Sequence, residues 1–254
     1  MPIEYNNKVQ PVSGQLGDDR AAFKVALIIP ALNEDAVIGR MLAALPPDLY
    51  EIVVVSDNGS TDRTSDVAYE SGTTVVTDDE RGYGAACLRA ISALPEMIDA
   101  VVFMQADLSE DPAEARDLLR PLREGTADLV IGSRTLGNAE PGALLPHQEF
   151  GNHVAAFLIR LLFGHRYTDL GPYRAIRMSA LQGLGMQDRN YGWTVEMQVR
   201  ALLCGLRVVE IPVRYGIRKA GVNKVSGNLV ASVKAGWKIV TTVLRLWVTR
   251  GAPA

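Results

Sequence analysis

The sequence contains few of the residues on which disulfide-linked or zinc-binding folds depend. Only two cysteines, Cys87 and Cys204, occur among 254 residues, and each stands in an apolar or helical context. Two isolated cysteines argue against a disulfide framework and favour a reducing compartment, so we expect a cytoplasmic protein. The three histidines, His147, His153 and His165, lack both the spacing of a zinc site and a neighbouring cysteine.

Long apolar runs are also missing. A membrane-spanning helix needs about 20 consecutive apolar residues. The nearest candidate, residues 229–248, is interrupted by Lys234, Lys238 and Arg245, so no spanning helix is expected. Residues 1–22 are polar and show no signal-peptide pattern, and we expect a flexible arm there.

Two common nucleotide-binding motifs are absent. No Gly-x-Gly-x-x-Gly follows the first apolar run, and no Gly-x-x-x-x-Gly-Lys-Ser/Thr occurs anywhere. These absences argue against a dinucleotide oxidoreductase and a P-loop phosphotransferase. A nucleic-acid partner is not expected either, because the basic part of the chain has no interleaved aromatic residues and no known binding module.

Charge is unevenly distributed along the chain. Residues 1–199 contain 16 Lys and Arg against 28 Asp and Glu, whereas residues 200–254 contain 10 Lys and Arg against the single acid Glu210. On charge alone, a basic C-terminal part on an acidic body predicts an anionic partner at that end, and a phosphorylated ligand, a lipid surface and a nucleic acid all fit that charge.

Short apolar runs alternate with helical patterns along most of the chain. The expected strands are 24–30, 51–56, 73–77, 100–104, 128–131 and 207–213. The expected helices are 34–45, 61–71, 83–94, 112–124, 148–163, 179–185, 193–204 and 228–249. Apolar runs without polar alternation are typical of parallel strands buried on both faces. The alternation predicts an α/β protein with right-handed crossovers, in which a long loop covers residues 135–147.

Polar residues gather where the expected strands end. In open α/β sheets, ligands bind beyond the carboxyl ends of the strands. Asn33 and Glu34 follow the first strand, Asp57 ends the second, Asp107 follows the fourth and Arg134 the fifth. A carboxylate at such an edge can hold a divalent cation that neutralises a diphosphate, and Asp107 is placed for this role.

Several segments together resemble glycosyltransferase family 2, and in particular its branch of polyprenyl-phosphate sugar transferases without a transmembrane domain. The matching segments are Pro30–Glu34, Val53–Asp62, Arg81–Ala86, Gln105–Pro112, Val130–Arg134, Thr168–Arg177, Glu196, Glu210–Arg214, Arg218 and Gly221–Ser226. The resemblance implies a GT-A fold, which is a Rossmann-like, mainly parallel sheet flanked by helices. It divides the chain into an arm (1–22), a catalytic domain (23–226) and a basic amphipathic helix with a tail (227–254).

The resemblance also implies roles for individual residues. The nucleotide sugar would contact Pro30, Asn33, Glu34, Asp57, Gly82, Gly84, Gln105, Ala106 and Asp107. The acceptor or phosphate groups would contact Arg134, Arg174, Trp193, Glu196, Arg218 and Lys224. Asp107 and Arg134 would be catalytic, and Asp107 with Gln105 would hold Mg²⁺ or Mn²⁺. The family's usual Asp-x-Asp is Gln105-Ala106-Asp107 in this sequence, so one formal charge at the metal is lost.

Family resemblance implies an inverting transfer from a UDP- or GDP-hexose to an acceptor, with a polyprenyl phosphate as the first expectation. An acceptor phosphate is already an anion and needs no strong base, whereas a hydroxyl acceptor needs one, for which Glu196 and the neighbours of Asp107 are candidates. A catalytically silent nucleotide-sugar binding protein is the other alternative, because Gln105 weakens the metal site.

The last expected helix is amphipathic and basic. At 100° per residue, Lys234, Lys238 and Arg245 fall within about 40° of one another. Apolar residues fill a broad separate arc, and they are Leu229, Val233, Trp237, Val240, Val243, Leu244 and Trp247. Such a helix at 228–249 either lies on the anionic inner face of a membrane or packs on the body or on a second subunit, with its basic stripe in solvent.

Overall fold

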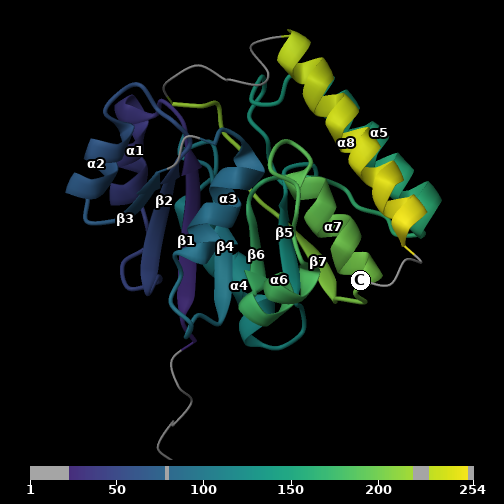
Figure 1. Cartoon of the computed structure of the whole chain (residues 1–254), viewed down its shortest axis with the longest axis horizontal. Coiled ribbons are helices and arrows are strands. Elements are labelled where there is room, and N and C mark those ends of the chain that lie inside the picture. The colour runs from purple at the N-terminus through teal and green to yellow at the C-terminus, as the bar shows by residue number, and fades with distance from the viewer. Residues whose placement is uncertain (1–22, 78–79, 220–228, 251–254) are drawn as a thin grey trace, which may run out of the picture.

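The computed structural model describes residues 23–77, 80–219 and 229–250, and within these residues one mixed sheet forms the centre of the molecule (Figure 1). Its strands are β1 (Val25–Ala31), β2 (Ile52–Asp57), β3 (Thr74–Thr77), β4 (Ala100–Phe103), β5 (Leu129–Ser133), β6 (Arg174–Arg177) and β7 (Val208–Pro212). They lie in the order β3-β2-β1-β4-β6-β5-β7. The predicted arm at 1–22 and the predicted domain boundary at 226/227 lie outside the described residues.

Parallel pairing dominates the sheet. β1 pairs with β2 and β4, β2 with β3, and β5 with β7, all in parallel. β6 is the exception, because it lies between β4 and β5 and is antiparallel to both. The mixed, mainly parallel α/β fold is therefore confirmed, but β6 falls in a segment where no strand was predicted.

Helices cover both faces of the sheet. They are α1 (Asp35–Ala43), α2 (Thr64–Glu70), α3 (Tyr83–Ser92), α4 (Ala115–Arg123) preceded by the 3₁₀ turn η1 (Pro112–Glu114), α5 (Pro146–Phe163), α6 (Met178–Leu184), α7 (Trp193–Leu203) and α8 (Leu229–Thr249). Successive β1 side chains alternate between the two faces. Val25, Leu27 and Ile29 join the core under α1 and α4, whereas Ala26 and Ile28 join the core under α3 and α7.

Two helix starts can be compared with the expected helices at 112–124 and 61–71. The Asp111 side chain accepts a hydrogen bond from the Ala113 amide at the start of η1, as a cap before Pro112 requires. The α2 helix, in contrast, begins at Thr64 and not at residue 61. The reason is that Asp62 bonds both the amide and the hydroxyl of Thr64 and also the amide of Asp35, so residues 57–63 form a loop that joins two strand ends.

The C-terminal helix α8 lies along the outside of the molecule beside α5, and it also contacts α7 (Figure 1). Its own residues Ala235, Val243 and Leu246 are buried. The two helices run in the same direction, since Ile239 and Gly151 line one pocket and Arg250 donates to the carbonyl of Leu162 near the other end of α5. The α8 helix thus forms an outer layer over α5 and α7.

Candidate active site

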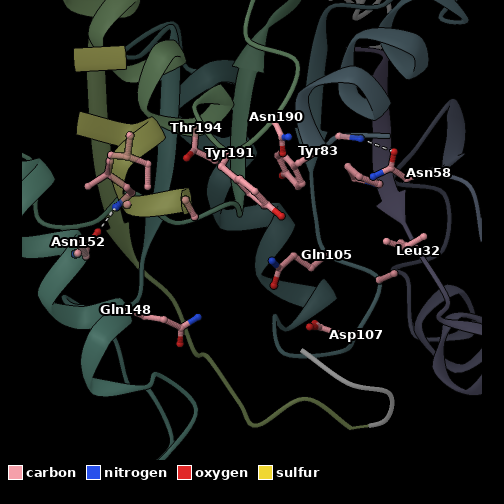
Figure 2. Close-up of a pocket in the computed structure, with 18 of the residues that line it drawn as sticks. Leu32, Asn58, Tyr83, Gln105, Asp107, Gln148, Asn152, Asn190, Tyr191 and Thr194 are labelled. Carbon is pink, nitrogen blue, oxygen red and sulfur yellow. Dashed lines mark hydrogen bonds between the residues drawn. The ribbon is translucent and has the colours of Figure 1, made fainter. Parts of the chain in front are cut away.

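A pocket of about 520 Å³ opens beyond the carboxyl ends of β1 and β4. Leu32 and Asn58 lie on one side of it, Gln148 and Asn152 of α5 lie on the opposite side, and Gln105 lies between them (Figure 2). Among the residues predicted from sequence, Pro30, Glu34, Gly82, Gln105, Ala106, Asp107, Arg134 and Arg218 line this pocket. The sheet topology has therefore brought loops from five distant parts of the chain to one place.

Asp107 occupies the loop that follows β4 and is only 5% exposed. The next residue, Leu108, takes a φ of 58°, a left-handed conformation that turns the chain back on itself. Ser109 consequently donates to Asp107 Oδ1 from both its amide (3.0 Å) and its hydroxyl (2.5 Å). The second oxygen, Oδ2, lies 3.0 Å from Nη2 of Arg218. The loop thus aims one carboxylate oxygen of Asp107 at a cation.

Gln105 is held from behind by Glu110. The Gln105 amide donates to Oε2 of Glu110 (2.8 Å), and its side-chain oxygen lies 3.2 Å from the Ser109 hydroxyl oxygen. Burial raises the pKa of Glu110 to about 8, since an ionised carboxylate is poorly solvated there. Glu110 is therefore mainly neutral at pH 7 and does not replace the charge that Gln105 lacks.

Asn33 and Asp57 shape the wall of the pocket by joining the loops after β1 and β2. The amide of Asn33 donates to the Ser60 hydroxyl, and its side-chain oxygen accepts from the Thr61 amide. Asp57 accepts from the Ser60 amide and from the Ser65 hydroxyl. Both side chains are committed to loop contacts, so the structure gives them a supporting position behind the lining residues.

Gly82 and Gly84 stand at the start of α3, where another segment passes at very short range. A Cβ at Gly82 would lie 2.1 Å from the carbonyl oxygen of Arg189, and a Cβ at Gly84 would lie 2.0 Å from that of Asp188. The Ala85 amide donates to the Arg189 carbonyl oxygen (2.9 Å), and this hydrogen bond joins the two segments. Glycine is required here because no side chain fits between the two backbones.

Arg134 is fixed before any ligand arrives. Its Nε and Nη2 donate to the two carboxylate oxygens of Asp169 at 2.8 and 2.7 Å, and its guanidinium lies 5.1 Å from the centre of the Tyr215 ring. Asp169 is 1% exposed and the Arg134 side chain 15% exposed, so one edge of the guanidinium reaches the pocket. A preoriented guanidinium suits a phosphate or carboxylate group.

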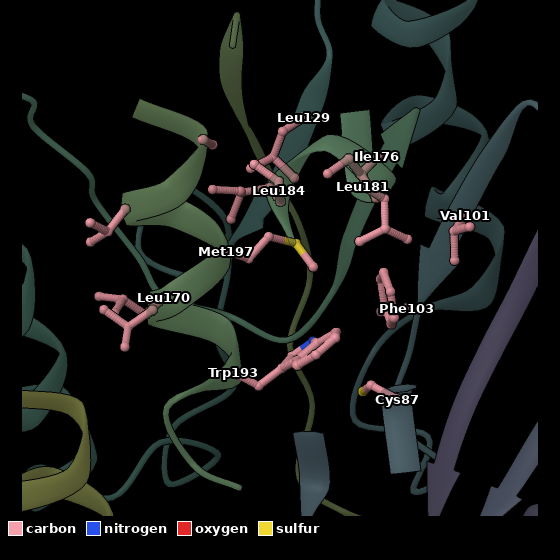
Figure 3. Packing of buried hydrophobic residues seen from close by; sticks show 14 of the residues in the cluster. Cys87, Val101, Phe103, Leu129, Leu170, Ile176, Leu181, Leu184, Trp193 and Met197 are labelled. Carbon is pink, nitrogen blue, oxygen red and sulfur yellow. The ribbon is translucent and has the colours of Figure 1, made fainter. Parts of the chain in front are cut away.

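Three predicted acceptor-binding residues lie elsewhere. Arg174 is 1% exposed and donates to the carbonyls of Thr194, Leu170 and Gly171. Trp193 is 1% exposed and packs in the core with Phe103, to which its ring stands edge-on (Figure 3). Glu196 is fully buried and pairs with Arg200 and Arg245. These residues cannot reach a ligand in this arrangement, and they support the walls instead. Lys224 lies outside the described residues.

Many residues that line the pocket were not predicted from the sequence. The additional lining residues include Arg81, Tyr83, His147, Gln148, Gly151, Asn152, Asn190, Tyr191, Thr194, Tyr215, Ala235, Gly236 and Ile239. One signal was available, because Gln148, Asn152 and Ala155 share one face of α5 at helical spacing. Polar residues facing inward on an otherwise apolar helix are typical of a binding wall.

The model of the family described as glycosyl transferase family 2 matches residues 26–185, which is more than half of the chain. The chain belongs to glycosyl transferase family 2. The predicted family, fold and glycosyltransferase activity are confirmed by this match.

Relatives of this family 2 glycosyltransferase extend over nearly its whole length. An uncharacterized glycosyltransferase of Mycobacterium tuberculosis is 38% identical over 224 residues, which cover 85% of this chain and 98% of the relative. An undecaprenyl-phosphate mannosyltransferase of Micrococcus luteus is 30% identical over 222 residues, covering 82% and 89% of the two chains. Glucosyl-3-phosphoglycerate synthase from Mycobacterium tuberculosis, in complex with Mn²⁺, UDP and phosphoglyceric acid, has the same fold, with a TM-score of 0.70, 23% identity and coverage of 92% and 80%.

No helix in the described part of this glycosyltransferase is long and apolar enough to cross a membrane.

The described side chains fit a metal ion only in company with a ligand. They contain no group of three or more histidine, cysteine, aspartate and glutamate residues that could hold a metal alone. Asp107 and Glu34 are the acidic residues among the described lining, and both contact one positive group, the Arg218 guanidinium. Oxygen ligands of this kind suit Mg²⁺ and Mn²⁺, and substrate phosphates commonly complete such a coordination shell. The pocket therefore fits a divalent cation that is shared with a diphosphate.

Proposed function

We propose that this glycosyltransferase transfers a hexose from a UDP- or GDP-hexose to a polyprenyl phosphate, with inversion at the anomeric carbon. The observation that carries the proposal is the presence in one pocket of two opposite electrostatic elements, the carboxylate of Asp107 and the preoriented guanidinium of Arg134. Asp107, with the Gln105 oxygen beside it, would hold Mg²⁺ or Mn²⁺ at the donor diphosphate. Arg134 would hold an acceptor phosphate.

The donor half rests on the loops after β1, β2 and β4. Pro30, Glu34, Ala106 and Gly82 line this half, and Asn33 and Asp57 hold its loops in place. A divalent cation there would stabilise the negative charge that grows on the departing nucleoside diphosphate. The complex of glucosyl-3-phosphoglycerate synthase with Mn²⁺ and UDP supports this choice of cofactor and nucleotide class.

The acceptor half favours a group that is already an anion. The two carboxylates in the described lining, Asp107 and Glu34, both belong to the donor half, and Glu196 is fully buried in its own ion pairs. No carboxylate in the described lining is thus placed to act as a general base, which a phosphate acceptor does not need. The undecaprenyl-phosphate mannosyltransferase of Micrococcus luteus supports the same acceptor class.

A lipid acceptor also suits the surface beside the pocket. The α5–α8 apolar surface consists of exposed large side chains, Phe150, Phe157 and Leu161 on α5 and Trp237, Leu244, Trp247 and Val248 on α8. Because the two helices run in the same direction, the exposed apolar residues of α5 and those of α8 occupy similar positions along the two helix axes. The helix α8 contains no acidic residue and carries the exposed Lys234 and, just after its end, the exposed Arg250. An apolar face with a basic rim suits the anionic inner face of a membrane, whereas pairing with a second copy would bring two basic rims together.

Transfer of label from nucleotide sugars to a lipid phosphate tests the proposal. The enzyme is incubated with radiolabelled UDP- and GDP-hexoses, Mn²⁺ and undecaprenyl phosphate in vesicles, and label is counted in the organic phase. We expect label from one donor class, loss of at least about 100-fold in Asp107→Asn, and normal transfer in Asp117→Asn, an exposed control.

Other outcomes would redirect the assignment. Label that passes only to alcohols would favour a hydroxyl acceptor, with His147 of the lining as the base to test next. Nucleotide binding without turnover on any acceptor would indicate a silent binding protein.

A further inference from the structure

Arg218 occupies the position where a cation would meet the acidic side of the pocket. Its Nη1 donates to both carboxylate oxygens of Glu34 at 2.9 Å, and its Nη2 lies 3.0 Å from Oδ2 of Asp107. The two carboxylate side chains are 6% and 7% exposed, whereas that of Arg218 is 22% exposed. One guanidinium thus bridges both acids of the described lining.

The contact is built into the backbone. Tyr215 forms an isolated bridge with Glu110, the Gly216 amide donates to the Ser109 carbonyl (2.7 Å), and the Lys219 amide donates to the Asp107 carbonyl (3.2 Å). The segment that carries Arg218 is therefore bonded to the same loop that carries Asp107. These backbone contacts fix the position of the Arg218 guanidinium relative to the carboxylates.

A metal ion and Arg218 would compete for one atom. Ser109 fills Oδ1 of Asp107 with two hydrogen bonds, so Oδ2 is the oxygen that remains for a metal, and Oδ2 is where Arg218 sits. Arginine does not lose its charge in proteins, so it cannot make way by deprotonation. A divalent cation at Oδ2 would repel the guanidinium at close range and force it to move.

We propose that Arg218 is a resident counter-cation, which holds Asp107 and Glu34 until a divalent cation displaces it and which then turns to the phosphates of the donor. This rests on the proposed function, because it assumes a metal–diphosphate donor. The exchange makes metal binding weak in the empty enzyme and strong when a diphosphate receives the released guanidinium. Metal and nucleotide therefore bind cooperatively, although Gln105 supplies no charge.

The test compares Mn²⁺ binding with and without nucleotide. Unbound Mn²⁺ is measured by electron paramagnetic resonance during titration of wild type, Arg218→Met, Arg218→Lys and Arg214→Met. Arg214 is the matched control, because it is exposed and pairs with Glu114 and Asp111 away from the pocket. Without nucleotide, we expect Mn²⁺ to bind Arg218→Met about tenfold more tightly than wild type, Arg218→Lys to fall between them, and Arg214→Met to match wild type.

When UDP is present, we expect the Arg218→Met substitution to weaken binding instead of strengthening it. At saturating Mn²⁺ we expect Arg218→Met to bind UDP about tenfold more weakly than wild type, measured by calorimetry. Thermal unfolding confirms that each variant is folded. Unchanged or weaker Mn²⁺ binding by folded Arg218→Met without nucleotide would overturn the proposal for Arg218. Failure of wild type to bind UDP or GDP with Mn²⁺ would instead overturn the proposed donor, so the two failures are distinguishable.

Discussion

Glu110 shows how a carboxyl group can sit behind an active site without adding charge to it. It is 2% exposed, and its Oε2 accepts the Gln105 amide while Oε1 has no hydrogen-bond partner among the described residues. Burial raises its pKa to about 8, with the nearby charge of Asp107 acting in the same direction. A neutral carboxyl group here keeps the local negative charge on Asp107 and Glu34, where the cation binds.

This raised pKa predicts how stability depends on pH. Between pH 4.5, the ordinary pKa, and about pH 8, the folded protein keeps a proton on Glu110 that the unfolded chain releases. Stability from this group is therefore present at low pH and lost as pH rises, by about 1.4 kcal/mol per pH unit in that window. We expect the stability of wild type relative to Glu110→Gln, from urea unfolding at pH 5, 6, 7 and 8, to fall steadily. A difference that stays constant over this range would contradict the neutral state of Glu110.

At the scale of helices, α8 turns two of its basic residues toward buried acids of the body and part of its apolar side toward solvent. Lys238 Nζ lies 2.9 Å from Oδ2 of the buried Asp188, and Arg245 lies 3.6 Å from the buried Glu196. This corrects the expectation of a solvated basic stripe on a helix that packs through its apolar arc. Val243 is buried as expected, but Trp237 is 71% exposed.

These ion pairs support the acceptor wall. Asp188 accepts the amides of Asn190 and Gly192, and Glu196 accepts the amides of Gln187 and Asp188. The same turn places Asn190 and Tyr191 in the lining of the pocket. Its backbone carbonyl groups also lie close to Gly82 and Gly84. The helix α8 therefore holds a turn that contacts both halves of the site.

Removing the Lys238 charge should therefore destabilise the protein. Lys238→Met leaves Asp188 as a buried carboxylate without its cation, and we expect a loss of about 2 kcal/mol, reduced from the value for a buried pair because Lys238 is half-exposed. Lys234→Met, at an exposed position one turn before Lys238, should change stability by less than about 0.5 kcal/mol. Urea unfolding measures both. Equal effects of the two substitutions would show that the Lys238–Asp188 pair is not a support.

Local sequence patterns predicted most helices and strands, but not every tertiary contact that they make. The strands at 24–30, 51–56 and 100–104 were predictable because apolar runs buried on both faces have little polar alternation. The strand β6 was missed, because its four residues begin and end with arginine and its place between β4 and β5 depends on tertiary pairing. Likewise, Arg174 belongs to a matching segment and Trp193 stands near one, but nothing local reveals that they point into the core.

At the scale of the whole molecule, the pocket and the α5–α8 apolar surface share the same two helices. Gln148 and Asn152 face the pocket from α5 while Phe157 is exposed on it, and Ile239 faces the pocket from α8 while Trp237 is exposed. A lipid acceptor could therefore keep its chain near a membrane while its phosphate reaches Arg134.

Vesicle binding tests this surface. We expect Phe157→Ser and Trp237→Ser to weaken co-sedimentation with phosphatidylglycerol vesicles by about tenfold or more each, because burying one such side chain contributes about 2 kcal/mol. Tyr69→Ser is the matched control, since Tyr69 is 74% exposed on α2. Binding to neutral phosphatidylcholine vesicles should be weaker for all four proteins. Equal sedimentation of wild type and both surface variants, or a dimer that gel filtration shows both variants to disrupt, would contradict the membrane assignment.

The central claim is that Asp107 joins a divalent cation to a nucleoside diphosphate. The most direct measurement is the affinity of UDP and GDP for wild type and Asp107→Asn by calorimetry, with Mn²⁺ and with EDTA, and with Asp117→Asn as control. We predict that Mn²⁺ raises the affinity of wild type for one nucleotide at least about tenfold and that Asp107→Asn loses this gain. Nucleotide affinity that is the same with Mn²⁺ and EDTA, or that survives unchanged in Asp107→Asn, would contradict the account.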